Sequence, residues 1–224
     1  MTEAAKIEFR YDRIANECLS MDDTSLVRKC QHGDSDAMEQ LILKYQNRIY
    51  NVILKICADP DDASELTQET FVKVIENIDK FQGKSRFYTW AFRIAVNLTL
   101  NYRKKNSKYD ISSLDAEKEY EEAQTTQAMK EFLKDDNSPD PVEVAQNKEL
   151  CDLTIKALLQ LDEPQKAVVV LRDIEGMNYA QIAEVLDIEL GTVRSRLSRA
   201  RGRLREILEA GCNDRRNENR RIAE

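Results

Sequence analysis

The stretch FQGKSRFYTWAFRIAVNLTLNYRKK, from Phe81 to Lys105, decides the fold class of this chain. Its apolar residues recur at steps of three and four, which is the spacing of one helix face, at Phe87, Trp90, Ala91, Ile94, Ala95 and Leu98. We therefore predict a helix that begins near Phe87 and leaves Trp90 at least half buried. The loop before this helix contains Gly83, which gives the backbone conformational freedom.

The same stretch concentrates positive charge and aromatic rings. It holds six Lys or Arg residues, no acid and six aromatic residues, although the whole chain has a net charge of −7. Unpaired bases stack on rings while cations follow the phosphate backbone. We therefore predict a surface for unpaired nucleic acid, with a pocket that holds an extruded base without altering it. Its candidate residues are Phe81, Lys84, Ser85, Arg86, Phe87, Tyr88, Arg93 and Asn97.

Helical periodicity also fills the sequence upstream of this stretch. A short helix from Thr24 to Gln31 is expected to end at Gly33, and the next helix to begin at the N-cap Asp34. A further helix follows Asp59 and Pro60, which suit a helix start. Its predicted apolar stripe is Ala63, Leu66, Phe71, Val74, Ile75 and Ile78.

The helical pattern stops after this first module. Residues 107–149 carry twelve acids and five bases and few large apolar side chains, so they cannot bury enough surface to offset the entropy of ordering. We predict an all-α fold of two small helical domains, at 22–106 and 146–212, joined by a flexible acidic linker at 107–145. Residues 1–21 form an N-terminal extension and residues 213–224 a C-terminal tail in this division.

The second module has the pattern of a helix-turn-helix. A helix capped near Asp162 closes at Gly176, and Asn178 with Gln181 forms a capping-box pair that opens the next helix. In the last helix, Val193, Leu197 and Ala200 share one face, while the other faces carry arginines and no acid between Thr192 and Arg205. This arrangement predicts a helix that reads duplex DNA.

The candidate duplex contacts fall into two groups. The first turn of the reading helix, from Gly191, would lie deepest in the major groove. Base contacts are therefore expected from Thr192, Arg194, Ser195 and Ser198, and phosphate contacts from Arg196, Arg199 and Arg201.

Composition argues against several other classes of protein. No run of apolar residues is long enough to span a membrane, no signal-peptide pattern is present, and the five cysteines include no C-x-x-C pair. We expect a cytoplasmic protein with reduced thiols. The sole histidine, His32, follows a predicted helix end, and no metal-ligand spacing occurs, so no catalytic residue, metal, cofactor or small-molecule substrate is expected.

The two modules together resemble a known family. DASELTQETFVKVIENIDKFQGKSRFYTWAFRIAVN, followed after a linker by LGTVRSRLSRAR, resembles bacterial RNA polymerase sigma factors of the sigma-70 family. The resemblance is to the extracytoplasmic-function (ECF) group, which retains only regions 2 and 4, and within it to the sigma-E-like branch. It covers residues 22–106 and 146–210.

The resemblance implies partners and roles. Glu65, Gln68 and Glu69 match the surface that grips the β′ clamp helices of core RNA polymerase, and a contact with the β flap is implied as well. The segment from Phe81 to Asn97 matches the part that melts and reads the −10 promoter element, and the helix from Leu190 to Arg203 matches the reader of the −35 element. Control by an anti-sigma factor is also implied.

Two other readings stay open at this point. A two-domain transcriptional regulator would carry a similar helix-turn-helix, but it should have an α/β receiver or ligand domain ahead of it. An interaction protein, such as an RNA-binding or sequestering module, is the second alternative. Only a sigma factor would confer initiation on core polymerase, so transcription from a promoter library separates the three.

Overall fold

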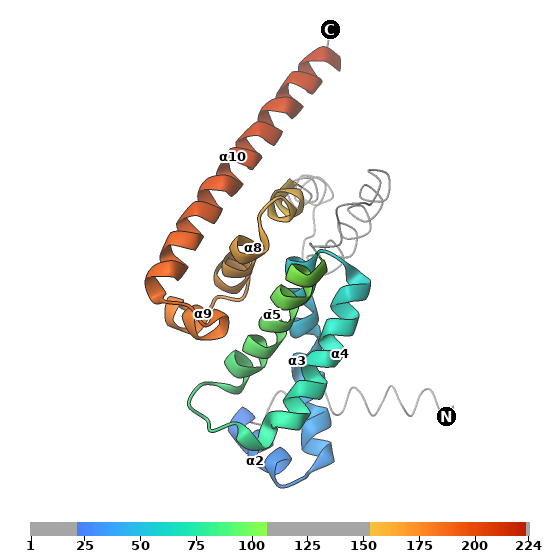
Figure 1. Cartoon of the computed structure of the whole chain (residues 1–224). Helices are drawn as coiled ribbons and strands as arrows, with labels where there is room; N and C mark the ends of the chain where they lie inside the picture. The colour runs from blue at the N-terminus through green and yellow to red at the C-terminus, as the bar shows by residue number, and fades with distance from the viewer. Residues whose placement is uncertain (1–21, 107–152, 223–224) are drawn as a thin grey trace, which may run out of the picture.

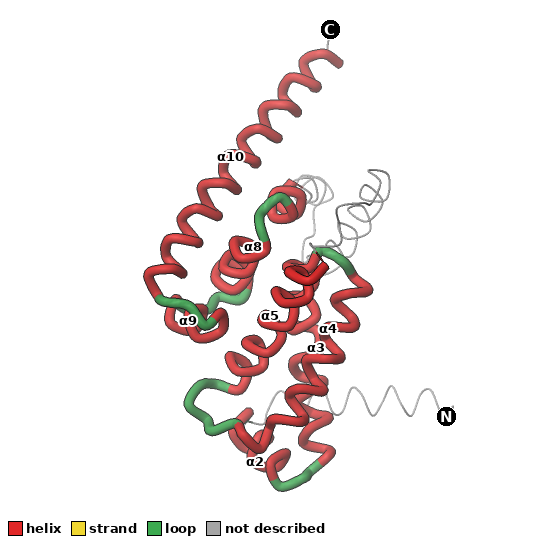
Figure 2. Tube along the Cα trace, viewed as in Figure 1, coloured by secondary structure: helices red, strands yellow, loops and turns green. Residues whose placement is uncertain are grey.

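The computed structural model describes residues 22–106 and 153–222, with side chains described up to residue 211. Every regular element in these ranges is helical (Figures 1 and 2). The first module contains α2 (Asp23–Gln31), α3 (Ser35–Cys57), α4 (Pro60–Asn77), η1 (Ile78–Lys80) and α5 (Phe87–Asn106). The second contains helical residues 153–159, α8 (Glu163–Val169), η3 (Val170–Ile174), α9 (Tyr179–Leu186) and α10 (Leu190–Ile222).

Short polar side chains define the helix starts of the first module. The Asp34 carboxylate accepts a hydrogen bond from the Ala37 amide at 3.0 Å, and Asp59 accepts one from the Asp62 amide at 2.7 Å. These bonds satisfy amides that have no partner inside the helix. Gly33 follows α2 with a φ of +83°, a conformation that glycine adopts without strain. The predicted starts of α3 and α4 are therefore confirmed.

Helix α5 is buried on more of its circumference than the predicted stripe implies. Phe92 and Val96, outside that stripe, are both 0% exposed, whereas Ile94 and Leu98 are only partly buried. The reason is that α5 packs against α3 and α4 and equally against α9 of the second module. Trp90 is partly exposed, and the prediction that at least half of it is buried is confirmed.

On α4, one predicted core residue is wrong. Ile75 is 48% exposed and lies near Val72, which is 52% exposed. The other five residues of the predicted stripe are buried, and Thr70 is buried in addition. Ile75 lies at the edge of this stripe, toward Val72, and packing of α4 against α3 and α5 leaves that edge uncovered.

The second module has capped helices and one irregular turn. Asp162 caps α8 through the Gln165 amide at 2.7 Å, and the Asn178–Gln181 capping box opens α9 with both of its bonds present. The chain between α8 and Glu175 continues as the π-helical turn η3, which the sequence pattern did not predict. Helix α10 runs on to Ile222, so the helix does not end at the boundary placed at residue 212.

The two modules lie against each other rather than apart. Their buried side chains form one continuous apolar cluster, from Leu26 in α2 to Ala200 in α10. Figure 1 shows α5 between α4 on one side and α8 and α9 on the other. The predicted linker at 107–145 lies outside the described residues. No helix among the described residues has both the length and the apolar character that a membrane crossing requires.

Glycine substitutions test the backbone of this fold. A Cβ at Gly202, in the middle of α10, would meet no atom within 4 Å, so Gly202→Ala should raise the free energy of unfolding by about 0.8–1 kcal/mol. Gly83 has a φ of +69°, and Gly83→Ala should lower it by about 1–2 kcal/mol. Urea denaturation of both variants checks the two signs, and a destabilised Gly202→Ala variant would contradict the helical backbone there.

Candidate nucleic-acid interface

A pocket forms around the loop that precedes α5. It has a volume of about 1150 Å³ and is lined by the loop residues 81–86, by the start of α5 and by residues of α2 and α3. Lys84 and Arg86 are exposed at the pocket, and Ser85 is partly buried. Six of the eight residues predicted to hold unpaired bases line it, namely Phe81, Lys84, Ser85, Arg86, Phe87 and Tyr88.

The loop itself is anchored by a side chain that sequence reasoning missed. The Gln31 amide at the end of α2 donates to the carbonyls of Ile78 and Phe81, at 3.0 and 2.9 Å. These two bonds bracket η1 and hold the point where the loop begins. Gln31 gave no sequence signal, because its two partners lie about fifty residues along the chain and are backbone atoms.

Phe87 lies at the wall of this pocket, but its ring is buried and does not form the exposed surface predicted from the sequence. Its side chain is only 3% exposed, and its ring packs at 5.5 Å from Tyr45 and 5.9 Å from Trp90, measured between ring centroids. A ring so enclosed has no free face on which a base could stack. Phe81, which is partly exposed, packs against Trp90 at 5.1 Å and offers the accessible ring of this cluster.

The remaining predicted residues of α5 point toward the second module. Arg93 forms an ion pair with Asp187 at 3.4 Å, and the Asn97 amide donates to the Val185 carbonyl at 3.5 Å. The Tyr88 hydroxyl accepts from the Gln181 amide. Arg93 and Asn97 therefore do not line the pocket of the loop, and the structure separates them from the other six candidates.

The outward crest of α10 consists of small residues. Val193, Leu197 and Ala200 are 0–2% exposed and pin the inner side of the helix, as predicted. Opposite them, at steps of four, three and four, stand Gly191, Ser195, Ser198 and Gly202, all exposed. Because the side chains on this outer side of α10 are small, the helix backbone can approach base edges closely.

Arginines flank this crest on both sides. Arg194, Arg201 and Arg205 follow one flank, while Arg199 and Arg203 follow the other. Thr192 and Arg196 lie lower on the second flank and are partly buried. The Ser195 hydroxyl donates to the Thr192 carbonyl at 3.1 Å. Two rows of guanidinium groups astride a narrow crest suit the two phosphate strands that border a DNA groove.

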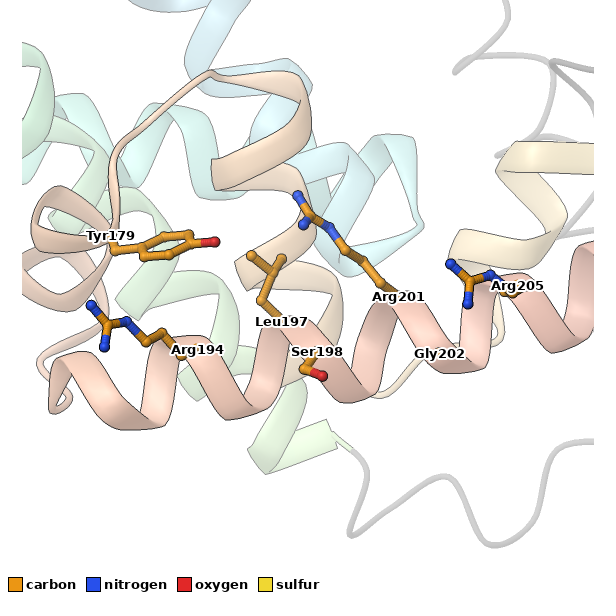
Figure 3. Close-up of a pocket in the computed structure, with 7 residues that line it drawn as sticks. All are labelled: Tyr179, Arg194, Leu197, Ser198, Arg201, Gly202 and Arg205. Carbon is orange, nitrogen blue, oxygen red and sulfur yellow. The ribbon is translucent and has the colours of Figure 1, made fainter.

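One flank forms a shallow groove of about 440 Å³, which Figure 3 shows. Tyr179, at the start of α9, faces the same side of α10 as Arg194 and Arg201. Arg201 is not a free cation, because its guanidinium contacts both carboxylate oxygens of Asp173 in η3. This contact raises the pKa of Arg201 above its ordinary value. Asp173, which lies in the π-helical turn η3, is a second residue that sequence reasoning missed.

A third exposed surface runs along α4. Glu65, Gln68 and Glu69 are all exposed, and the same side continues through Val72 and Ile75. Beyond Ile75 lies a groove of about 720 Å³ between α4 and the start of α3, lined by Met38 and Ile42 among others. The surface therefore combines carboxylates at one end with exposed apolar side chains at the other.

His32 and Cys57 are of residue types that often act in catalysis, and the structure shows the surroundings of both. The His32 ring nitrogen lies 2.6 Å from the Arg28 carbonyl, at the end of α2. Burial raises the pKa of the Cys57 thiol to about 12, so the thiolate is not formed at neutral pH. Within residues 22–106 and 153–222, no group of three His, Cys, Asp or Glu side chains is arranged to hold a metal ion.

Comparison with known proteins places both modules. The family model for sigma-70 region 2 matches residues 41–109, and that for sigma-70 region 4 matches residues 152–204. The chain is 34% identical over 183 residues to the ECF RNA polymerase sigma-E factor of Haemophilus influenzae, covering 80% of this chain and 91% of the relative. It is also 34% identical over 192 residues to the RNA polymerase sigma-H factor of Pseudomonas aeruginosa, covering 84% and 94%.

Solved structures with the same fold include two complexes. CnrH in complex with the cytosolic domain of CnrY is 22% identical, with a TM-score of 0.57, over 84% of this chain and 97% of that one. RpoE in complex with the anti-sigma factor NepR, from Bartonella quintana, is 22% identical, with a TM-score of 0.53, over 76% and 96%. Two family models in the expected order and relatives matched over nearly their full length lead to one conclusion: the chain belongs to the sigma-70 family of RNA polymerase sigma factors, in its ECF group.

Proposed function

We propose that this chain binds core RNA polymerase and directs it to promoters by reading duplex DNA with α10 and capturing unpaired bases with the loop 81–86 and α5. The observation that carries the proposal is the small-residue crest of α10 between two rows of arginine. The same chain also carries the pocket around the loop 81–86, which is lined by aromatic and positively charged side chains.

The −35 contact follows from the shape and charge of α10. Gly191, Thr192, Arg194, Ser195 and Ser198 belong to the part of the helix that enters the groove. Arg199, on the far flank, meets a phosphate strand, and Arg196 meets one lower on that flank. Arg201 takes a second role beside the predicted phosphate contact: because Asp173 holds its guanidinium, it orients α10 on η3, and it offers its remaining N–H groups to a phosphate.

The −10 contact uses the loop pocket. Phe81 provides a ring face, and Lys84 and Arg86 provide charge for the backbone on either side of an extruded base. Ser85 and the loop amides offer hydrogen bonds to a base edge. Phe87 supports Phe81 and Trp90 from within the core. Holding a base in this pocket uses binding energy to open the duplex.

The polymerase contact uses the outer side of α4. Glu65, Gln68 and Glu69 provide polar contacts to the β′ clamp helices, and Val72 with Ile75 provides the apolar part of the same surface. An apolar centre bordered by polar groups is the usual anatomy of a stable interface. A second contact, between the C-terminal module and the β flap, is proposed from the family alone.

An anti-sigma factor is proposed as the regulator. Two solved structures with this fold are complexes, one of them named as a complex with the anti-sigma factor NepR. Such a partner would cover the polymerase-binding or DNA-binding surfaces. As a polymerase subunit the chain would work in the cytoplasm and would carry out no chemistry of its own. The domain division proposed is 22–106 for region 2 and 146–212 for region 4, with α10 continuing past it.

Transcription in vitro tests the proposal. The purified chain is added to core polymerase and a library of promoter fragments, and the 5′ ends of the transcripts are mapped. Defined start sites that need the chain support the proposal, and their absence at every fragment rejects it. A transcriptional regulator of another class would bind DNA without conferring initiation.

Arg194 provides a sharper test of the −35 contact. We expect Arg194→Ala to weaken binding to its preferred −35 sequence by about 1–3 kcal/mol and to relax base preference at one position, because a bidentate guanine contact is lost. Arg199→Ala should instead weaken binding to all sequences equally. Selection of bound sequences from a random duplex pool, in the presence of core polymerase, measures both. An unchanged sequence preference in Arg194→Ala would contradict its role.

A further inference from the structure

The groove between α4 and the start of α3 is lined mainly by apolar side chains. They come from three walls: Cys30 of α2, Met38, Ile42 and Leu43 of α3, and Ile75 and Ile78 of α4 and η1. Met38 and Ile42 are only partly buried, and Ile75 is 48% exposed. An open apolar groove between helices is the kind of site that receives the apolar face of a further helix.

Carboxylates border this groove, and no Lys or Arg belongs to the described residues that line it. Asp34 and Glu39 lie on the α3 side and Asp79 lies on the η1 side, and all three are exposed. An occupant with cations beside its apolar face would therefore meet carboxylates on either wall.

The sequence ahead of α2 contains an apolar stripe that fits such a groove. Residues 1–21 lie outside the described residues, and their sequence places apolar side chains at steps of four, three and four, at Ile7, Tyr11, Ile14 and Cys18. This spacing puts the four side chains on one side of a helix. No Gly or Pro interrupts residues 1–21, so the composition is compatible with a helix.

Charges flank this stripe unevenly. Basic residues follow one side of it at steps of four and three, at Lys6, Arg10 and Arg13. Glu8 and Asp12 lie along the other side, and Glu17 is the one acid of residues 6–18 on the basic side. A helix docked with the stripe inward would thus present its basic side to a groove wall that carries carboxylates.

The length and the position of the segment also fit. Along α3 the lining runs from Ser35 to Gln46, about 17 Å of helix, and residues 7–18 as a helix would have the same length because both stretches contain the same number of residues. The described chain begins beside the groove: the Asp23 carboxylate binds Lys44, two residues before Gln46, at 2.7 Å. The connection from residue 18 to residue 22 can span about 13 Å.

We propose that residues 7–18 dock in this groove as a helix, with the stripe from Ile7 to Cys18 facing inward, and compete there with core RNA polymerase. Ile75 lines the groove and also belongs to the proposed polymerase surface, so the two occupants exclude each other. The docking needs only the groove and the segment, whereas the competition rests on the proposed function of α4.

Docking should be nearly balanced with release. A helix of this length is marginal in water by itself, so the groove has to supply its stability. We expect the segment to be docked in about two thirds of free chains. Its amides would then exchange about threefold more slowly than in a chain that cannot dock, and polymerase binding would be weakened about threefold. The two factors have one cause and should agree.

The test of docking is hydrogen–deuterium exchange of the full chain, read by mass spectrometry on peptides from residues 1–21. Ile7→Asp/Ile14→Asp places two carboxylates in the stripe, and the matched control Phe9→Asp/Asn16→Asp places two on the opposite side of the same helix. After correction for the intrinsic exchange rate of each sequence, the stripe variant should exchange about threefold faster than the wild-type chain, and the control less than about 1.5-fold faster. Equal rates in the wild-type chain and the stripe variant would overturn the docking.

A variant of the groove ties the protection to this site. Met38→Asp puts a charge on the α3 wall, and urea denaturation verifies that the variant folds; if it does not fold, Glu39→Lys at an exposed position of the same wall replaces it. The folded variant should release the segment as Ile7→Asp/Ile14→Asp does. Wild-type exchange in it would place the segment elsewhere and overturn the proposal.

Dilution separates docking within one chain from docking between two copies. Exchange rates of the wild-type chain should not change on about tenfold dilution, because an intramolecular contact does not depend on concentration. Slow exchange that is lost on dilution would assign the groove to the segment of a second copy, and the proposal would fall.

The competition is measured by binding to core polymerase against a labelled wild-type chain. The stripe variant should bind about threefold more tightly than the wild-type chain, and the control within about 1.5-fold of it. Faster exchange without tighter binding, in a chain that directs initiation, would reject the competition and leave the sigma-factor function intact. If the wild-type chain directs no initiation, the proposed function fails, while the exchange rates still decide the docking.

Discussion

Val72→Asp/Ile75→Asp should bind core RNA polymerase several hundredfold more weakly than the wild-type chain, since two apolar anchors of about 1.5–2 kcal/mol each would be lost. Both side chains are about half exposed, at 52% and 48%, on the same side of α4 as Glu65, Gln68 and Glu69. In a docked complex the introduced carboxylates would be desolvated without a partner. In the free chain they remain in water, so the fold should be unaffected within about 0.5 kcal/mol.

The measurement is competition for core polymerase against a labelled wild-type chain. Asn47→Asp/Ala210→Asp is the matched control, because it adds the same charge at exposed positions of α3 and α10. Urea denaturation of both variants verifies that each is folded. Wild-type affinity in the folded Val72→Asp/Ile75→Asp variant would remove this side of α4 from the polymerase interface.

Phe92→Ala should lower the free energy of unfolding by about 3–5 kcal/mol, the usual cost of emptying an aromatic site in a packed core. Phe92 is 0% exposed in α5, where the Tyr88 ring meets it edge-on at 6.2 Å and the Arg48 guanidinium lies 5.7 Å from its centroid. Tyr88 and Arg48 also bind the second module, through Gln181 and Glu175. The cavity would therefore loosen the contact between the modules as well as the helix.

Two further variants keep this expectation testable if Phe92→Ala does not fold. Phe92→Leu should show a smaller loss in the same direction, because most of the volume is retained. Phe81→Ala, at a partly exposed ring, should cost less stability than Phe92→Ala but should impair promoter opening, measured by permanganate reactivity of unpaired thymines. A loss of less than about 1 kcal/mol in Phe92→Ala would contradict its place in the core.

The helix starts and the family of this chain could be predicted from the sequence without the tertiary structure. Asp34, Asp59, Asp162 and the Asn178–Gln181 pair cap their helices as predicted. Each of these signals is confined to about one turn of the chain, where a side-chain oxygen meets an amide three residues on. The all-α class and the arginine-rich helix follow from similar short-range patterns, and the family from the resemblance of the two quoted motifs.

Contacts between segments far apart in the chain could not be predicted from the sequence. The exposure of Ile75, the burial of Phe87 and Phe92, the Asp173–Arg201 contact and the placement of α9 over α5 all join segments that are separated along the chain. A helical stripe says that one side of a helix is apolar, but it does not say which neighbour the helix will meet or whether a second side will also be covered.

By itself, the amino-acid sequence determined that the described modules are helical, where their capped helices begin, and that one helix carries a row of arginines without acids, because each of these depends on neighbours within a turn or two of the chain. Only the tertiary structure decided that Tyr88, Arg93 and Asn97 face α9, and that Val72 and Ile75 are left exposed. Both outcomes depend on how helices far apart in the chain share a limited apolar surface, and no local pattern encodes that division.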